Sequence, residues 1–184
     1  MKLARISLLR IEKDDPVDID LLEYIKENLE KSFNLPCEIA DTVVEVPVSA
    51  YNPQREQYEG EIFLKIIRDY SRQKKRITLG VTKVDLYTDA LNFIFGLAQC
   101  PGNSAIISLC RLYPSFYFLS HDEDLLRKRT LTEAVHELGH CMGLKHCKLR
   151  RCVMAFSNSI GDTDYKQPDF CDNCRKKLDR IMEW

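Results

Sequence analysis

Apolar residues along the chain follow two periods, one typical of strands and the other of helices. Residues 4–11 are predicted to form a buried strand, with apolar Ile6, Leu8, Leu9 and Ile11. Residues 18–36 instead repeat apolar residues at helical spacing and stop at Pro36. The same criteria predict strands over residues 42–48, 76–88, 92–98 and 104–113, and a helix over 61–70 with Pro53 as a candidate opening. A last helix runs up to Gly143 and has two possible starts with capping-box patterns, Ser120 and Thr130. We favour Ser120, because Leu125 and Leu126 then give the first turns apolar residues to bury.

The predicted order is strand, helix, strand, helix, three strands and a last helix, which indicates an α/β fold. After Gly143 the periodicity weakens into a cysteine-rich tail, and we expect a small C-terminal subdomain there. With 184 residues, 45% of them hydrophobic, the chain can bury one core. A net charge of -1 gives no overall field that would favour nucleic acid or a membrane surface.

The compartment matters because the chain has eight cysteines. Arg5 and Arg10 interrupt the first apolar stretch and no small-residue cleavage site follows, so we expect neither a secretory leader nor an extracellular protein. No apolar run reaches the roughly 18 residues that a membrane-spanning helix needs. We therefore expect a cytoplasmic protein, in which clustered cysteines indicate metal more often than disulfides.

The segment HELGHCMGLKHC, residues 136–147, holds three of the four histidines. On a helix of about 100° per residue, His136 and His140 lie one turn apart, and a separate apolar stripe occupies the other side. That stripe consists of Leu131, Val135, Leu138 and Met142. A histidine pair away from the core stripe favours two nitrogen ligands of one metal over two satisfied or surface histidines. Glu137, next to the first ligand, can reach a metal-bound water as a general base instead of serving as a solvated helix charge.

His146 would point away from His140 on a continued helix, so the chain must reverse between them. Gly143 lies midway, and glycine readily adopts the left-handed conformation that ends a helix. Three neutral imidazoles leave one coordination position open, which is typical of catalytic zinc.

A second candidate metal site follows directly, with the spacing C-x4-C and later C-x2-C that is typical of structural zinc. Its ligands would be Cys147, Cys152, Cys171 and Cys174. Two disulfides, or a redox pair at the second motif, are the weaker alternatives. Adjacent residues of an extended chain point in opposite directions, so His146 and Cys147 can serve different metals. The other cysteines are interpreted as packing residues; these are Cys37, Cys100, Cys110 and Cys141.

HELGHCMGLKH resembles the signature of the metzincin zinc endopeptidases, and CVMAF supplies Met154 where that family has its methionine turn. The added cysteines resemble archaemetzincins in particular. The resemblance implies a metzincin-like fold with a twisted mixed sheet and an active-site helix, catalytic and structural Zn²⁺ ions, and no obvious inhibitory pro-segment. It also implies an upper subdomain over residues 1–143 and a lower one over 144–184. Several metzincins carry a Tyr just after the turn to stabilise the oxyanion, but Phe156 stands here, and nothing selects among Ser157, Asn158 and Tyr165.

The resulting hypothesis is a monomeric zinc metallopeptidase that hydrolyses peptide or protein substrates with Glu137 as general base. We expect the substrate to pair with an edge strand over Ala105 to Arg111. The alternative is a metzincin-like protein that binds peptides with little or no turnover, or a weak aminopeptidase. Basic runs at 148–151 and 175–177 could suggest a nucleic-acid module, but that interpretation leaves the histidines unexplained, so we expect no nucleic-acid partner.

Overall fold

The computed structural model describes residues 5–72 and 76–183. Residues 1–4, which include the start of the first predicted strand and part of the segment tested for a leader, lie outside the described residues. The strands are β1 (Ile6–Glu12), β2 (Cys37–Glu45), β3 (Tyr51–Asn52), β4 (Gln57–Glu59), β5 (Ile77–Thr82), β6 (Leu86–Thr88), β7 (Leu91–Ile94), β8 (Gly96–Ala98) and β9 (Ser104–Ser108). The helices are α1 (Ile19–Phe33), α2 (Gly60–Ser71), α3 (Glu123–Cys141), α4 (Ile160–Tyr165) and α5 (Asp172–Met182), with short 3-10 turns η1 (Val48–Ala50) and η2 (Pro114–Tyr117).

The larger sheet has the strand order β2-β1-β5-β9-β8. Its first four strands are parallel, and β8 pairs antiparallel with β9 in the register Gly96↔Ile107. A smaller sheet, ordered β3-β4-β6-β7, lies beside it. The helix α1 connects the parallel strands β1 and β2, and α2 lies between β2 and β5, whereas short strands link β5 to β9. This mixture of parallel strands and helices confirms the predicted α/β class.

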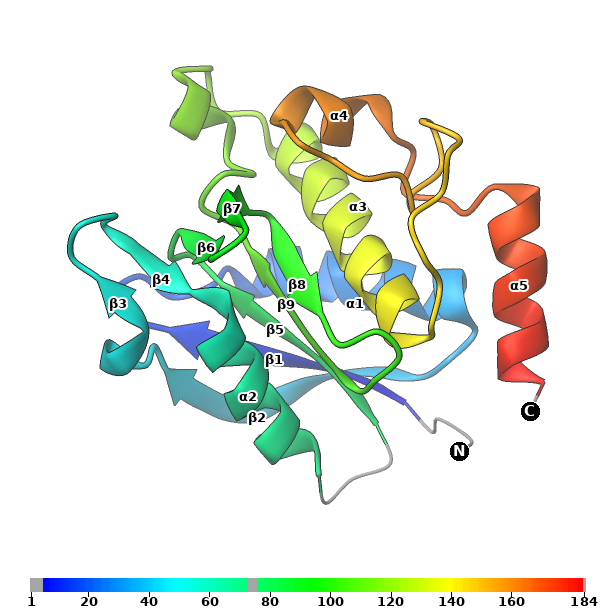
Figure 1. Ribbon diagram of the computed structural model, residues 1–184, viewed down its shortest axis with the longest axis horizontal. Coiled ribbons are helices and arrows are strands. Elements are labelled where there is room, and N and C mark those ends of the chain that lie inside the picture. The colour runs from blue at the N-terminus through cyan, green and yellow to red at the C-terminus, as the bar shows by residue number, and fades with distance from the viewer. Residues whose placement is uncertain (1–4, 73–75, 184) are drawn as a thin grey trace.

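Successive residues of the central strands face two different cores, because side chains alternate across a strand. Ile6 and Leu8 of β1 face the core that α1 and α3 cover. Leu9 and Ile11 face the second core, which α2 covers on the opposite side of the sheet. Figure 1 shows α3 and α2 on these two sides, with α4 lying over the N-terminal part of α3. The helix that carries the HELGH segment is thus fixed between the sheet and the C-terminal part of the chain.

Several predicted boundaries differ from the structure. The helix α3 begins after Asp122, whose side chain accepts a hydrogen bond from the Leu125 amide, and Ser120 lies outside it. Pro53 lies in the turn between β3 and β4, so the prediction that it opens α2 was wrong; α2 begins at Gly60. The tail after Gly143 contains the helices α4 and α5, which the sequence analysis did not predict. Both are short and lie among the cysteines, so their helical periodicity is hard to recognise. Among the described residues, no helix is long and apolar enough to cross a membrane.

Candidate active site

The C-terminal turns of α3 are buried by both the sheet and the tail. The predicted stripe of Leu131, Val135, Leu138 and Met142 lies in the core. The helix ends at Cys141, and Gly143, two residues later, has φ 98°. The Gly143 amide bonds to the His140 carbonyl at 2.8 Å, and the Leu144 amide bonds to the Gly139 carbonyl at 3.0 Å. This pair of bonds is a Schellman motif, and it reverses the chain as expected.

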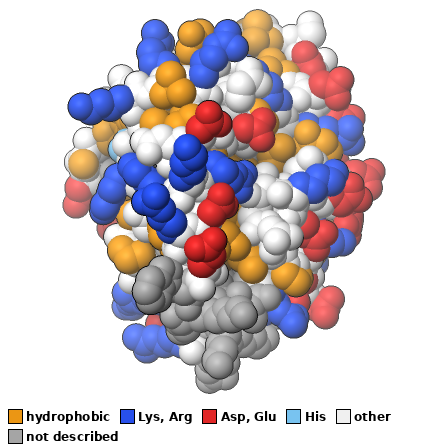
Figure 2. Space-filling model, turned by 90° about the vertical axis from the view of Figure 1, so that its right-hand side faces the viewer, with side chains coloured by type: hydrophobic (Ala, Val, Ile, Leu, Met, Phe, Trp, Pro, Cys, Tyr) orange, Lys and Arg blue, Asp and Glu red, His pale blue; other side chains and the backbone are white. Residues whose placement is uncertain are grey.

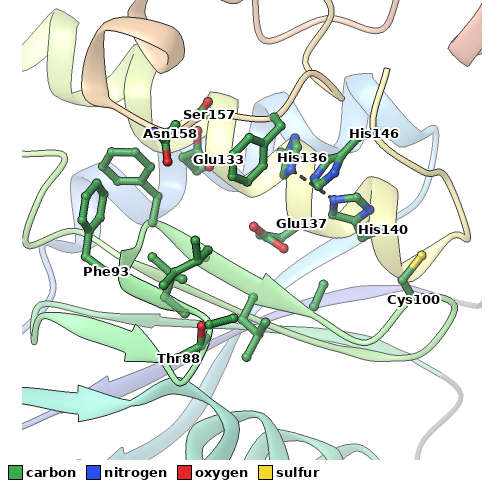
Figure 3. A pocket seen from close by; sticks show the side chains of 18 of the residues that line it. Thr88, Phe93, Cys100, Glu133, His136, Glu137, His140, His146, Ser157 and Asn158 are labelled. Carbon is green, nitrogen blue, oxygen red and sulfur yellow. Dashed lines mark hydrogen bonds between the residues drawn. The ribbon is translucent and has the colours of Figure 1, made fainter. Parts of the chain in front are cut away.

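That reversal brings three imidazoles together (Figure 3). His136 Nδ1 lies 2.7 Å from the Val153 carbonyl, and His140 Nδ1 lies 2.8 Å from the Leu144 carbonyl. Since a carbonyl oxygen only accepts, each Nδ1 carries the proton and each Nε2 presents a lone pair. The ring of His146 lies 5.4 Å from that of His136 and 4.8 Å from that of His140, centroid to centroid.

The geometry of this histidine group fits zinc. The Nε2 atoms of His136 and His140 are 3.1 Å apart, and one ligand atom from each histidine lies within 4.8 Å of the others. Two nitrogens bound to one tetrahedral zinc at about 2.0–2.1 Å are about 3.3 Å apart. Burial lowers the pKa of all three imidazoles, with the Lys166 cation adding to the shift of each. The group is therefore held in the neutral form that binds a metal.

Glu137 lines the same cleft as the histidines. Burial raises the pKa of its carboxyl well above the usual value, and the nearby Glu133 carboxylate raises it further. Glu133 also lines the cleft, one helical turn earlier on α3. Its Oε1 accepts a hydrogen bond from Thr163 Oγ1 at 2.9 Å and lies 3.4 Å from Lys166 Nζ. Lys166 is 1% exposed, so this is a buried ion pair beside the site.

Met154 is fully buried beneath α3, in the segment where the methionine turn was predicted. A Cβ added to Gly139 would overlap the Met154 sulfur, so the glycine in HELGH makes room for this side chain. The adjacent Ala155 carbonyl accepts a hydrogen bond from Lys166 Nζ at 3.2 Å. The next residue, Phe156, packs its ring 5.2 Å from that of His146. These contacts connect the tail directly to the histidine group.

The four cysteines predicted to share a metal also come together, with all four sulfurs within 4.8 Å of one another. The sulfurs of Cys147 and Cys171 are 3.9 Å apart, close to the roughly 3.8 Å expected for thiolates at about 2.3 Å from a tetrahedral zinc. Cys171 stands at the N-terminus of α5. Burial opposes ionisation there, but hydrogen bonds from the Cys174 amide and from neighbouring thiols lower the pKa of Cys171 to about 7. Burial raises the pKa of Cys152 and Cys174, so among these three it is Cys171 at which the thiolate form that binds a metal is favoured.

His146 belongs to the first group and its neighbour Cys147 to the second. Of the remaining cysteines, Cys141 hydrogen-bonds the Ser104 carbonyl at 3.4 Å and is outside both groups. Cys37 and Cys141 are buried and Cys110 is partly buried. Cys100 was predicted to be a packing residue, but it lines the cleft.

A cleft of about 830 Å³ runs between the β7–β8 segment and α3. Its edge strand is β8, because β9 lies between β5 and β8. The expectation that the substrate pairs with Ala105 to Arg111 was therefore wrong. The apolar pattern of residues 105–111 suits an interior strand as well as an edge strand. The prediction failed because hydrophobic pattern alone does not give the order of strands in a sheet. Ser157 and Asn158 line the cleft, while Tyr165 does not. The Tyr165 ring instead lies under the guanidinium groups of Arg150 and Arg151.

The sequence interpretation missed three residues of this site. Glu133 could have been found, since it lies one turn before Glu137 on the same row of α3. Lys166 gave no signal, because a lysine in a polar tail is normally solvated. Gly96 also gave none; its importance comes from a close approach of the Glu137 side chain to β8.

Comparison with known proteins gives a consistent result. A sequence model of peptidase family M54 matches residues 17–180. An archaemetzincin of Methanocaldococcus jannaschii is 42% identical over 176 residues, which are 96% of this chain and 95% of that relative. The crystal structure of an archaemetzincin from Methanopyrus kandleri has a TM-score of 0.82 at 32% identity, covering 98% of this chain and 97% of that one.

A second crystal structure, of an archaemetzincin from Archaeoglobus fulgidus complexed with malonate, has a TM-score of 0.78 at 35% identity. It covers 94% of this chain and 99% of that one. Sequence and fold thus agree over nearly the whole length, and the chain belongs to peptidase family M54, the archaemetzincin family of zinc metallopeptidases.

Proposed function

We propose that His136, His140 and His146 hold a catalytic Zn²⁺ and that Glu137 is the general base for hydrolysis of peptide bonds. The observation that carries this proposal is the arrangement of the histidine group. Carbonyl oxygens fix two of its Nδ1 atoms, the Nε2 atoms converge, and Glu137 lines the same cleft. When bound, zinc supplies a Lewis acid that lowers the pKa of water and polarises the scissile carbonyl.

The chain's own groups supply the remaining chemistry. Glu137 removes a proton from the attacking water and returns it to the amine that leaves. The open side of β8 binds the substrate in extended form through backbone hydrogen bonds. Ser157 and Asn158 are the candidates for oxyanion stabilisation, because both line the cleft, whereas Tyr165 is outside it. The Ser157 hydroxyl is buried and, among the described residues, has no hydrogen-bond partner.

A structural Zn²⁺ at the group of four cysteines completes the proposal, giving two zinc ions per chain. The compact, partly buried sulfurs support this assignment. We place the boundary between the upper and lower subdomains at residue 143, just after α3 ends at Cys141, and assign Met154 to the methionine turn. We further propose a cytoplasmic monomer; the eight cysteines, which all lie among the described residues and are not in disulfides, suit a reducing compartment.

A peptide fits the molecule better than a nucleic acid. On the face around α5, lysine and arginine side chains are interspersed with aspartate and glutamate (Figure 2). Some of the basic residues are already engaged: Arg175 donates to the Ser32 carbonyl at 2.7 Å, and Arg150 lies 3.6 Å from Asp162. No continuous basic surface is visible on this face to follow a phosphate backbone.

The test compares wild-type protein with Glu137→Gln on a peptide library, read by mass spectrometry, with zinc measured by elemental analysis. We expect two zinc ions per chain in both proteins and cleavage that falls at least about 100-fold in the variant, the scale of a lost general base. Gln is isosteric and keeps the site packed. Equal cleavage by both proteins would eliminate Glu137 as the base. Two bound zincs without any cleavage would favour a peptide-binding protein that does not turn over.

A further inference from the structure

Gly96, the first residue of β8, lies directly against the Glu137 side chain. A Cβ built on Gly96 would stand 2.6 Å from both Cγ and Oε1 of Glu137 and 2.8 Å from its Cδ. Non-bonded carbon atoms approach favourably only to about 3.5–4.0 Å. Any side chain at residue 96 would therefore occupy space that the Glu137 carboxylate now fills.

The directions of the backbone amide and carbonyl groups along β8 also bear on how a substrate could bind. The Phe95 carbonyl accepts from the Ser108 amide at 2.8 Å, and the Gln99 amide donates to the Ser104 carbonyl at 3.0 Å. Residues 95, 97 and 99 therefore direct their polar groups toward β9. Because these directions alternate along a strand, Gly96 and Ala98 direct theirs toward the open edge.

We propose that Gly96 is the positioning residue for the general base. Its missing side chain lets the carboxylate of Glu137 lie against the strand that receives the substrate, so the base and the substrate backbone meet at one residue. This inference rests on the proposed function of Glu137. It explains why the strand that forms the cleft wall carries a glycine where β-propensity alone would favour a larger residue.

A side chain at residue 96 would move the carboxylate, not the strand. The strand is held by its ladder to β9, and α3 is fixed between the sheet and the tail. The end of the Glu137 side chain has rotatable bonds and is the easiest part to displace. Relief of a 2.6 Å contact to an ordinary one requires a shift of about 1 Å, a misplacement that can cost about 100-fold in rate.

The experiment uses zinc-loaded Gly96→Ala, with Gly161→Ala as the matched control. A Cβ at Gly161 would meet just the Ser159 hydroxyl, at 3.7 Å. For Gly96→Ala we expect two bound zincs, a kcat roughly 10- to 100-fold lower and a KM within about threefold, because the new methyl group points toward Glu137 and leaves the strand edge free. Gly161→Ala should retain the wild-type kcat.

A second readout, which does not depend on turnover, is the melting temperature of the zinc-loaded protein. Glu137→Ala supplies the background, because it removes the Cγ, Cδ and Oε1 atoms that a side chain at residue 96 would meet. Gly96→Ala should lower the melting temperature by roughly 3–8 °C with Glu137 present and by less than about 2 °C in Glu137→Ala.

The outcomes separate the two hypotheses. If Glu137→Gln retains full activity, the proposed function fails. If Glu137→Gln is inactive while Gly96→Ala keeps the wild-type kcat, the base stands and the role of Gly96 is refuted. Equal effects of Gly96→Ala on melting temperature with and without the Glu137 side chain would also refute it.

Discussion

Removal of the Lys166 cation tests how the tail is fixed to the active-site helix. Lys166 Nζ lies 3.4 Å from Glu133 Oε1 and donates to the Ala155 carbonyl at 3.2 Å. Lys166→Met keeps most of the side-chain volume and removes the charge. Among the described residues, Glu133, which is 3% exposed, would then keep the Thr163 hydroxyl as a hydrogen-bond donor but no cation.

The magnitude follows from the burial of both partners. Breaking a buried ion pair by removing one partner costs about 3–5 kcal/mol, because the remaining charge has no compensation. The pair Lys83–Asp15 provides the control: its atoms are 2.8 Å apart, but the Asp15 side chain is 76% exposed. Loss of an exposed pair costs about 0.2–1 kcal/mol, so Lys83→Met should be nearly neutral.

The assay is urea unfolding of zinc-loaded protein, with single and double variants in one cycle. Glu133→Gln keeps an acceptor for Thr163 and removes the negative charge. Because no lone charge is left when both changes are combined, the double variant with Lys166→Met should lose at least about 2 kcal/mol less than the sum of the single losses. Additive losses, or a Lys166→Met loss no larger than that of Lys83→Met, would refute this account of the pair.

Two further variants test the cysteine group and the edge strand. Cys171→Ser should lower the zinc content from two to one per chain and lower the melting temperature, since the proposed ligand set is incomplete; unchanged zinc content would contradict the assignment. Ala98→Pro removes an amide that points to the open edge and leaves the sheet intact. It should raise KM roughly tenfold or less, in line with about 1 kcal/mol per hydrogen bond. An unchanged KM would mean that the substrate does not pair with this strand.

Local spacing carried most of the sequence prediction. His136 and His140 are one turn apart, Gly143 ends the helix, and His146 returns, so the histidine group follows from short-range geometry. The cysteine pairs are similarly close in sequence. The α/β class followed from hydrophobic periods and is confirmed by the structure and its likeness to archaemetzincin crystal structures.

What the sequence did not reveal depends on long-range contacts. Strand order placed β8 at the edge, although β8 and β9 have similar apolar patterns. Lys166 meets Glu133 across 33 residues, through a helix that the loose tail pattern did not predict. Gly96 meets Glu137 only after sheet and helix have packed. Such contacts are set by tertiary structure, so no local period encodes them.

The segment between Cys152 and Cys171 is anchored at both ends and near residues 164–166. The cysteine group holds both ends, Lys166 is tied to α3, and the Arg129 guanidinium holds Asp164 with two bonds of 2.7 Å. One wall of the cleft is consequently tied to α3 through charged side chains. A hinged lid on this side would have to break buried charge pairs, so we expect the substrate to make the adjustment. Such an enzyme would select unfolded segments and chain ends over folded surfaces.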